Sequence, residues 1–307
     1  MITAGDIIRL ADEYSAACDE VEIIFGEPMR EHTSFRLGGG AQIFIRPYTE
    51  EALKMGLLLC RDYELPVYIL GKGTNLLVSD KGVRGAVFDM TALDGWEIEG
   101  TRVRAAAGAL LRHVAKAAAE QSLSGLEFAH GIPGSLGGAL FMNAGAYGSE
   151  LKDVTQSLRL MDRGGKIYDV PAEDMDFSYR HSRAEESGEI ILSAELVLTP
   201  GRRAEIEETM RELSEKRRAS QPLTTYNAGS TFKRPPGHFA GRLIEEAGLK
   251  GFSLGGARVS EKHAGFVVQE GKATAADVFN LCRHVKEVVK EKSGVELSLE
   301  VRTWGEF

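Results

Sequence analysis

The stretch "SGLEFAHGIPGSLGGALFMNAGAYGSE" at residues 124–150 places the strongest constraint on the fold. Seven of the 24 residues from Gly125 to Gly148 are glycine, and Phe, Leu, Met and Tyr are interleaved with them. A flexible linker would not carry so many large apolar side chains. Glycine allows backbone conformations and close approaches that a Cβ forbids. We therefore expect an ordered loop whose backbone takes unusual conformations or lies directly against a ligand.

A second glycine-rich turn, "GKGTN" at 71–75, follows the apolar run "VYIL" at 67–70. Successive backbone N–H groups in such loops form concave anion sites that suit a pyrophosphate. Two ordinary tight turns explain the same glycines equally well, because glycine-rich turns are common. From the residues alone both interpretations of 71–75 and 131–148 stay open.

The hydrophobic pattern alternates strands with helices. A hairpin is expected at 157–170, with Gly164 and Gly165 in its turn, and Thr274 with Asp277 is expected to form a capping box. The predicted strands are 67–70, 76–79, 86–90, 102–107, 190–198, 265–269 and 295–303. The predicted helices are an amphipathic segment at the start of the chain and residues 50–63, 110–121, 203–218, 239–247 and 276–292. Thr49 is expected to cap the helix at 50–63.

Composition narrows the class of protein. The 307 residues carry 37 basic and 45 acidic side chains, a net charge of −8, which argues against nucleic acid or a membrane surface as a partner. Cys18, Cys60 and Cys282 form no C-x-x-C, as expected of reduced thiols in a cytoplasmic protein without disulfides. The seven histidines show no metal-binding spacing, so we expect no metal. The charged residues of the first segment argue against a signal peptide, and no membrane insertion is expected.

The residues Ser230-Thr-Phe-Lys233 match the S-x-x-K of penicillin-binding enzymes, and Lys292-Ser293-Gly294 resembles their K-T-G element. The context argues against that interpretation. No S-x-N lies between the two, and the second element falls at the end of a predicted helix, where glycine is a common C-terminal cap. An acyl-transferring serine enzyme is kept as the second hypothesis.

Six segments occur together and in order: "HTSFRLGGGA" (32–41), "LGKGTNLLVSD" (70–80), "GIPGSLGGALFMNAGAYG" (131–148), "FSYRHS" (177–182), "NAGSTFKRP" (227–235) and "GVELSLEVRTWG" (294–305). In this the chain resembles the UDP-N-acetylenolpyruvoylglucosamine reductases over nearly its whole length. It lacks the insertion that in longer members delivers a tyrosine over the substrate, so it resembles their shorter, second type.

The resemblance implies an α+β protein with a two-subdomain FAD-binding fold of the vanillyl-alcohol-oxidase (PCMH) type. A C-terminal α+β substrate domain would follow. The expected division is 1–84 and 85–203 for the FAD-binding subdomains and 204–307 for the substrate domain.

The resemblance also implies a reaction. Non-covalent FAD and the co-substrate NADPH would reduce UDP-N-acetylglucosamine enolpyruvate to UDP-N-acetylmuramate, in peptidoglycan precursor synthesis. A hydride would pass from reduced FAD to C3 and a proton from Ser230 to C2. A nucleotide-sugar-binding regulator without turnover is a third hypothesis, against which stands the joint presence of three catalytic residue types.

The resemblance carries the family's site residues onto positions of this sequence. Arg234 stands where the longer type has asparagine. The catalytic residues would be Arg180, Ser230 and Glu300. The substrate-binding residues would be Arg217, Lys233 and Arg234. The FAD-binding residues would be Gly71, Gly73, Thr74, Asn75, Gly131, Ile132, Gly134, Ser135, Gly137, Asn143, Gly145, Ala146 and Tyr147.

The role of Glu300 has a separate basis in the pattern "VELSLEVR". Apolar residues alternate there with Glu296, Ser298, Glu300 and Arg302, so these four would share one face of a strand. Periodicity alone favours a solvated outer face for them. The resemblance instead favours a catalytic Glu300, either as a protonated acid that polarises the enolate or as part of a proton relay.

Overall fold

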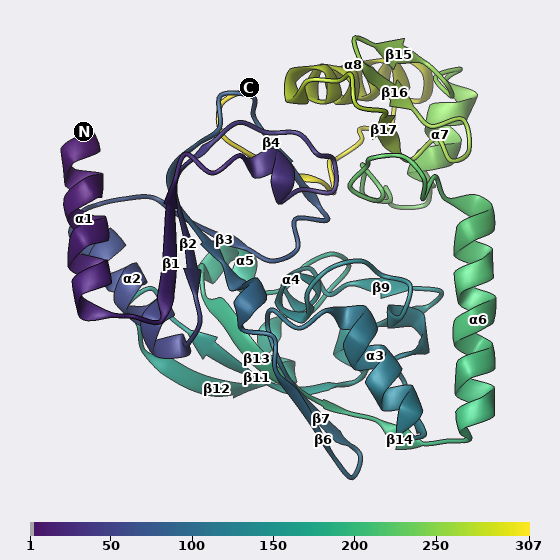
Figure 1. Cartoon of the computed structure of the whole chain (residues 1–307). Helices are drawn as coiled ribbons and strands as arrows, with labels where there is room; N and C mark the ends of the chain where they lie inside the picture. Colours follow the sequence, from purple (N-terminus) through teal and green to yellow (C-terminus); the bar gives the residue numbers. More distant parts are fainter. Residues whose placement is uncertain (1–2) are drawn as a thin grey trace. The chain divides into compact units, whose positions relative to one another are not determined.

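The computed structural model describes residues 3–307, and the chain divides into two units (Figure 1). The first unit comprises the described residues to Phe25, with Ile43–Lys72 and Gly85–Glu215. The second unit comprises Gly26–Gln42, Gly73–Arg84 and Lys216–Phe307. Each unit is built from segments that are distant in the sequence, because the chain passes between the units several times.

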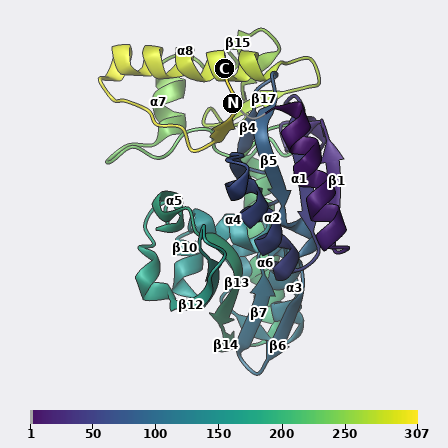
Figure 2. The ribbon, with the colours of Figure 1, turned by 90° about the vertical axis from the view of Figure 1, so that its left-hand side faces the viewer.

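One sheet of the first unit has the strand order β1-β2-β5-β3, with β1 (Val21–Phe25) antiparallel to β2 (Ala41–Pro47). Strand β3 (Val67–Leu70) runs parallel to β5 (Val83–Asp89). Helices α1 (Ala4–Ala17) and α2 (Glu50–Asp62) pack against each other and share an apolar core with this sheet (Figure 2). Each helix contributes one buried apolar stripe to this core.

The larger sheet of the first unit is antiparallel, in the order β12-β11-β13-β7-β6. Its inner face buries alternate apolar side chains against α3 (Leu111–Glu120) and α4 (Leu136–Phe141). Its outer face carries ion pairs, such as those of Glu195 with Arg102 and Arg104. The strands are β6 (Trp96–Glu99), β7 (Arg102–Ala106), β11 (Thr155–Met161), β12 (Ile167–Pro171) and β13 (Ile190–Val197).

The remaining elements of the first unit are short. They are the pairs β8 (Leu123–Ser124) with β14 (Thr199–Pro200) and β9 (Gly145–Ala146) with β10 (Ser149–Glu150), and the helix α5 (Ala184–Ser187). The boundary between the units falls within the long charged helix α6 (Arg203–Ser220).

The second unit folds around α8 (Ala275–Ser293), which packs on α7 (Ala240–Glu246) and on a three-stranded sheet (Figure 1). The sheet consists of β15 (Ser253–Leu254), β16 (Ala257–Val259) and β17 (Val267–Gln269). A separate parallel pair joins β4 (Leu76–Val78) to β18 (Arg302–Trp304). The last strand of the chain is thereby hydrogen-bonded to the segment that follows the glycine-rich turn.

The mixture of helices and strands confirms the predicted α+β class, and the predicted caps of two helices are present. Thr49 accepts a hydrogen bond from the Ala52 amide, and Thr274 with Asp277 forms a capping box. The predicted strand at 295–303 is wrong over most of its length, because regular pairing begins only at Arg302. Before that point Leu299 makes an isolated bridge with Phe232, so no continuous ladder forms.

Among the described residues, no helix combines the length and the apolar character that crossing a bilayer requires.

Candidate active site

The glycine-rich loop of the first unit lies against the segment that precedes α3. The Gly134 carbonyl accepts a hydrogen bond from Leu111, and the Gly137 amide donates to the Ala107 carbonyl at 2.8 Å. Gly134 has φ +135°, a conformation that a side chain disfavours. A Cβ on Gly137 would lie 2.7 Å from that of Ala107. The glycine at 137 is therefore required by packing within the protein, whatever the loop binds.

Ser135 lies at the centre of this loop and is 2% exposed. Its hydroxyl is buried and has no hydrogen-bond partner among the described residues. A Cβ on Gly71 would lie only 2.3 Å from this oxygen, so glycine at 71 keeps the space beside the hydroxyl open. Buried hydroxyls are nearly always hydrogen-bonded. An oxygen of a ligand phosphate would satisfy this one, as expected of a loop that holds FAD.

The same loop continues into a tight hairpin formed by β9 and β10. Tyr147 and Gly148 occupy its turn with φ +56° and +92°, as in a type I′ turn. Tyrosine is unusual there, since its Cβ is strained at positive φ. Its ring is 51% exposed, and its hydroxyl donates to the Leu213 carbonyl at 3.1 Å. The structure thus gives Tyr147 an exposed ring and a partner on α6.

Arg180 lies in the turn that runs from Ser178 to His181, and the backbone groups of these two end residues are hydrogen-bonded to each other. Its φ of +56° is the left-handed conformation that type II turns require at their third position, where glycine is usual. Such strain costs about 1–3 kcal/mol and concentrates at functional sites. The guanidinium donates to the Gly145 carbonyl at 3.2 Å and lies 5.0 Å from the centre of the Tyr179 ring.

Ser230 and Glu300 belong to the second unit, on two segments that are hydrogen-bonded to each other. The Glu300 amide donates to the Thr231 carbonyl at 2.9 Å, and the Lys233 amide donates to Ser298 at 2.9 Å. Thr231 is 1% exposed, and its hydroxyl accepts from the Val267 amide. The structure therefore brings Ser230 close to Glu300 and fixes both segments on a buried framework.

The turn at Gly73–Asn75 belongs to the same framework. The Asn75 side-chain amide donates to the Glu300 carbonyl at 2.9 Å, and the Arg302 amide donates to the Asn75 carbonyl at 3.0 Å. Gly73 has φ +60°, and a Cβ there would lie 1.9 Å from the His32 carbonyl oxygen. The predicted cofactor turn and the predicted catalytic glutamate are thus in direct contact, and Asn75 has a structural partner.

His263, which the motifs did not single out, is linked through Gly265 to Thr231, the residue after Ser230. The Gly265 carbonyl accepts from the Thr231 amide, and the Gly265 amide donates to Nδ1 of His263 at 3.1 Å. Burial lowers the pKa of His263, so its ring is neutral near pH 7 and Nδ1 can accept this bond. Nothing in the sequence pattern distinguishes such a histidine from a surface one.

The three predicted substrate cations all lie in the second unit. The Arg234 guanidinium lies 4.7 Å from the centre of the Phe239 ring, which is 60% exposed. Lys233 extends from the segment bonded to Ser298, and Arg217 lies in the last turn of α6. The substrate roles of these three cations stay predictions.

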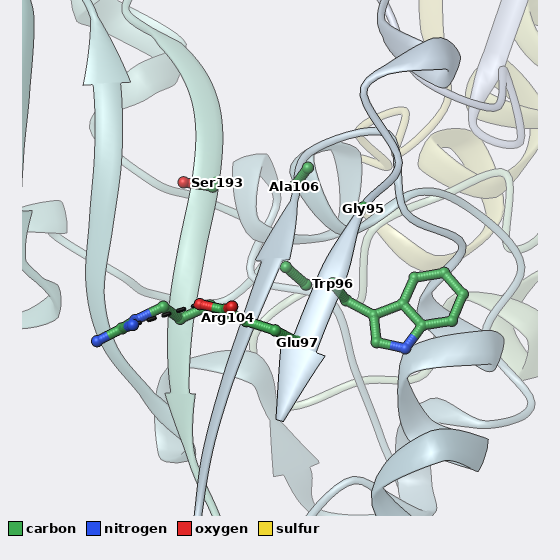
Figure 3. A pocket seen from close by; sticks show the side chains of 7 residues that line it. Gly95, Trp96, Glu97, Arg104, Ala106 and Ser193 are labelled. Carbon is green, nitrogen blue, oxygen red and sulfur yellow. Dashed lines mark hydrogen bonds and ion pairs between the residues drawn. The ribbon is translucent and has the colours of Figure 1, made fainter. Parts of the chain in front are cut away.

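A pocket elsewhere in the first unit contains none of the candidate residues. It lies over β6, β7 and β13, where Glu97 and Glu195 engage Arg104 at 3.3 and 2.8 Å. Figure 3 shows the Trp96 ring directed away from Arg104. These three charged side chains are already paired with one another, so this surface is no candidate for the reaction. Its lining residues are Gly95, Trp96, Glu97, Arg104, Ala105, Ala106 and Ser193.

Two family models match the chain. Residues 41–171 match the FAD binding domain, and residues 221–304 match the C-terminal domain of UDP-N-acetylenolpyruvoylglucosamine reductase. Ser135 lies in the first matched range, and Ser230 and Glu300 lie in the second. The buried Ser135 hydroxyl, which has no partner among the described residues, is therefore in the part of the chain that matches an FAD-binding domain.

Relatives match nearly end to end. The UDP-N-acetylenolpyruvoylglucosamine reductase of Caldanaerobacter subterraneus subsp. tengcongensis is 48% identical over 297 residues, covering 97% of this chain and 98% of the relative. That of Clostridioides difficile is 50% identical over 286 residues, covering 93% and 94%. The crystal structure of UDP-N-acetylenolpyruvylglucosamine reductase (MurB) from Thermus caldophilus superposes with a TM-score of 0.80 at 35% identity, covering 93% of this chain and 99% of that chain.

These matches confirm the resemblance to the shorter type of reductase and the PCMH-type FAD-binding fold followed by a MurB C-terminal domain. The chain belongs to the UDP-N-acetylenolpyruvoylglucosamine reductase family, the FAD-binding oxidoreductases of peptidoglycan precursor synthesis.

Proposed function

We propose that this protein reduces UDP-N-acetylglucosamine enolpyruvate to UDP-N-acetylmuramate with NADPH, in the cytoplasm. The observation that carries the proposal is the second-unit framework, in which the Ser230 segment, the Glu300 segment and the Gly73–Asn75 turn are hydrogen-bonded together. A coupled hydride and proton transfer requires a proton donor and an acid at fixed positions beside the cofactor. Ser230, Glu300 and the Gly73–Asn75 turn would supply these parts within one hydrogen-bonded network. The division at residues 84 and 203 stays a prediction.

The chemistry that FAD would supply when bound is the transfer of a hydride from NADPH to C3 of the enolpyruvyl group. The buried hydroxyl of Ser135 would donate a hydrogen bond to a phosphate oxygen of the cofactor. The backbone of Gly131–Gly137, Gly71 and Gly73–Asn75 would line the diphosphate. The backbone of Asn143–Tyr147 would lie nearer the ribityl chain and the flavin ring.

Ser230 would protonate C2. A carbanion-like C2 is a far stronger base than water, so a hydroxyl can serve as the acid if its position is fixed. The neighbouring Thr231 supplies that fixation, because its amide, carbonyl and hydroxyl are all hydrogen-bonded within the unit. Lys233 needs no role as a base for Ser230.

Arg180 would hold the substrate carboxylate as negative charge develops at C2. A guanidinium is always charged and binds a carboxylate through two parallel N–H groups. Glu300 would polarise the enolate as a protonated acid or belong to a proton relay to Ser230. Its main chain is bonded to both Thr231 and Asn75, which favours a fixed position over a mobile one.

The acyl-transfer hypothesis loses its second element in the structure. Lys292 and Ser293 lie in the last turn of α8, and Gly294 caps that helix with φ +71°. The penicillin-binding mechanism needs this element on a strand beside the nucleophile.

The test of the proposed function is direct. The purified protein should show flavin absorption bands, and NADPH oxidation should depend on added UDP-N-acetylglucosamine enolpyruvate, with UDP-N-acetylmuramate as product. A colourless protein that cannot be reconstituted with FAD would overturn the proposal. A mass shift of Ser230 with a β-lactam would favour acyl transfer instead.

Ser135→Ala should weaken FAD binding about tenfold or more, because a hydrogen bond to a charged group contributes about 1.5–3 kcal/mol. The melting temperature of the apoprotein should not fall, since the lost hydroxyl has no partner among the described residues. Fluorescence titration of the apoprotein with FAD measures the dissociation constant. Unchanged affinity in Ser135→Ala would remove this hydroxyl from the cofactor site.

Lys233→Ala and Arg217→Ala should raise the KM for the nucleotide sugar, by about 10- to 100-fold if each makes a charge-assisted hydrogen bond. Arg218→Ala is the matched control, because Arg218 lies in the same helical turn as the half-buried Arg217 but is exposed. Steady-state kinetics with saturating NADPH separates KM from kcat. A large loss of kcat at unchanged KM would contradict an anchoring role.

A further inference from the structure

Asn143 is a fully buried polar side chain, 0% exposed, at the end of the glycine-rich loop of the first unit. Its Nδ2 donates to Glu150 Oε2 at 2.9 Å and to the Ser178 carbonyl at 3.0 Å. Its Oδ1 accepts from the Lys152 amide at 3.0 Å. An amide side chain can make four hydrogen bonds, so three of its four positions are already filled within the protein.

The contact with Ser178 ties Asn143 to the turn that carries Arg180. That turn places a non-glycine residue at φ +56°, and its closing pair consists of two long backbone bonds of 3.2 and 3.3 Å between Ser178 and His181. A strained conformation persists only where its surroundings hold it. On one side of the turn the Ser182 hydroxyl donates to the Phe141 carbonyl at 2.6 Å, and on the other Asn143 donates to Ser178.

We propose that Asn143 is a positioning residue, whose side chain holds the Ser178–His181 turn in the conformation that presents Arg180. The inference rests on the proposed role of Arg180 toward the substrate carboxylate. On this proposal the side chain of Asn143 makes its hydrogen bonds within the protein, while the backbone of Asn143 remains part of the loop expected to hold FAD.

The conformation of Asn143 explains why an amide is present at this position. Its φ of +41° lies in the left-handed region, where asparagine and aspartate are the best tolerated of the residues with a Cβ. Aspartate shares the backbone preference but has no N–H to donate. It would set a carboxylate against Glu150 and against the Ser178 carbonyl. Of these two residues, only asparagine suits both the backbone conformation and the two acceptors.

The same side chain also stabilises its own hairpin, through Glu150 and Lys152, and the test must separate the two functions. Glu150→Gln keeps an acceptor for Asn143 and serves as the control. In the double variant Asn143→Asp/Glu150→Gln, the amide introduced at position 150 can donate to the carboxylate introduced at position 143. The hairpin link is then restored, while the Ser178 link stays broken.

Hydrogen exchange followed by mass spectrometry tests the link on the folded protein without any substrate. We expect amides of residues 178–183 to exchange at least tenfold faster in Asn143→Asp and in the double variant, and at the original rate in Glu150→Gln. Peptides of α8, in the other unit, supply an internal reference. An unchanged turn in Asn143→Asp, or full restoration in the double variant, would overturn the proposal.

Kinetics then tests the consequence for Arg180. Asn143→Asp should slow flavin reoxidation by the enolpyruvyl substrate by about tenfold, with reduction by NADPH and FAD content retained. Combined with Arg180→Ala it should add nothing further, because both changes act through one side chain. Additive losses, or equal slowing of both half-reactions, would refute the positioning role. If the wild-type protein turns out not to reduce the substrate, the proposed function fails while the exchange result still decides whether Asn143 holds the turn.

Discussion

Ser230→Ala should leave flavin reduction by NADPH near its original rate and slow flavin reoxidation by the enolpyruvyl substrate by about 10²–10⁴-fold, the usual contribution of a general acid. The reason is that Ser230 would act only at C2, in the half-reaction that follows the oxidation of NADPH to NADP⁺. Anaerobic stopped-flow at the flavin absorption band measures the two half-reactions separately. The variant should fold normally, since the segment is held by backbone groups and by Thr231.

Two further variants make this result specific. Ser230→Cys should retain more activity than Ser230→Ala, because a thiol can also donate a proton. Ser298→Ala removes an exposed hydroxyl from the opposing segment, whose backbone carbonyl accepts from Lys233, and should have no effect. If Ser230→Ala slowed both half-reactions equally, the damage would be to the site as a whole, and the proton-donor role would be untenable.

Local chemistry explains which parts of the fold could be predicted from the sequence. Thr49, Thr274 with Asp277, and Gly294 act within one helical turn, so their caps can be identified from neighbouring residues. The strand 67–70 and the helix 50–63 likewise follow from local pattern, and the structure has them at Val67–Leu70 and Glu50–Asp62.

Contacts between distant segments explain what could not be predicted. Asn75 and Glu300 are 225 residues apart, and the bond that joins them leaves no local pattern. The alternation at 295–301 correctly buries Leu297 and Val301, but whether the segment pairs continuously depends on a partner near Phe232 that periodicity does not reveal. From the resemblance, Asn143 is expected only to belong to the FAD-binding loop. The hydrogen bond of its side chain to the Ser178 carbonyl, 35 residues away, leaves no local pattern.

Arg180→Ala should lower kcat/KM for the enolpyruvyl substrate by about 10²–10³-fold, the usual loss when one stabilising donor is removed from a developing anion. Arg180→Lys should recover only part of this, because lysine keeps the charge but lacks the planar fork that holds a carboxylate. The rate of flavin reduction by NADPH should be unchanged in both. Equal activity of Arg180→Lys and the wild type would show that a point charge suffices and would contradict bidentate binding.

The strained turn allows the function of this side chain to be separated from its structural cost. Arg180→Gly also lacks the guanidinium, but glycine adopts φ +56° without penalty, so this variant should be more stable than Arg180→Ala by about 1 kcal/mol. Its loss of activity should nevertheless be as large as that of Arg180→Ala. Chemical denaturation and half-reaction kinetics on the same preparations measure both quantities. If Arg180→Gly regained activity along with stability, the defect of Arg180→Ala would lie in the backbone of the turn, and the guanidinium would have no part in the reaction.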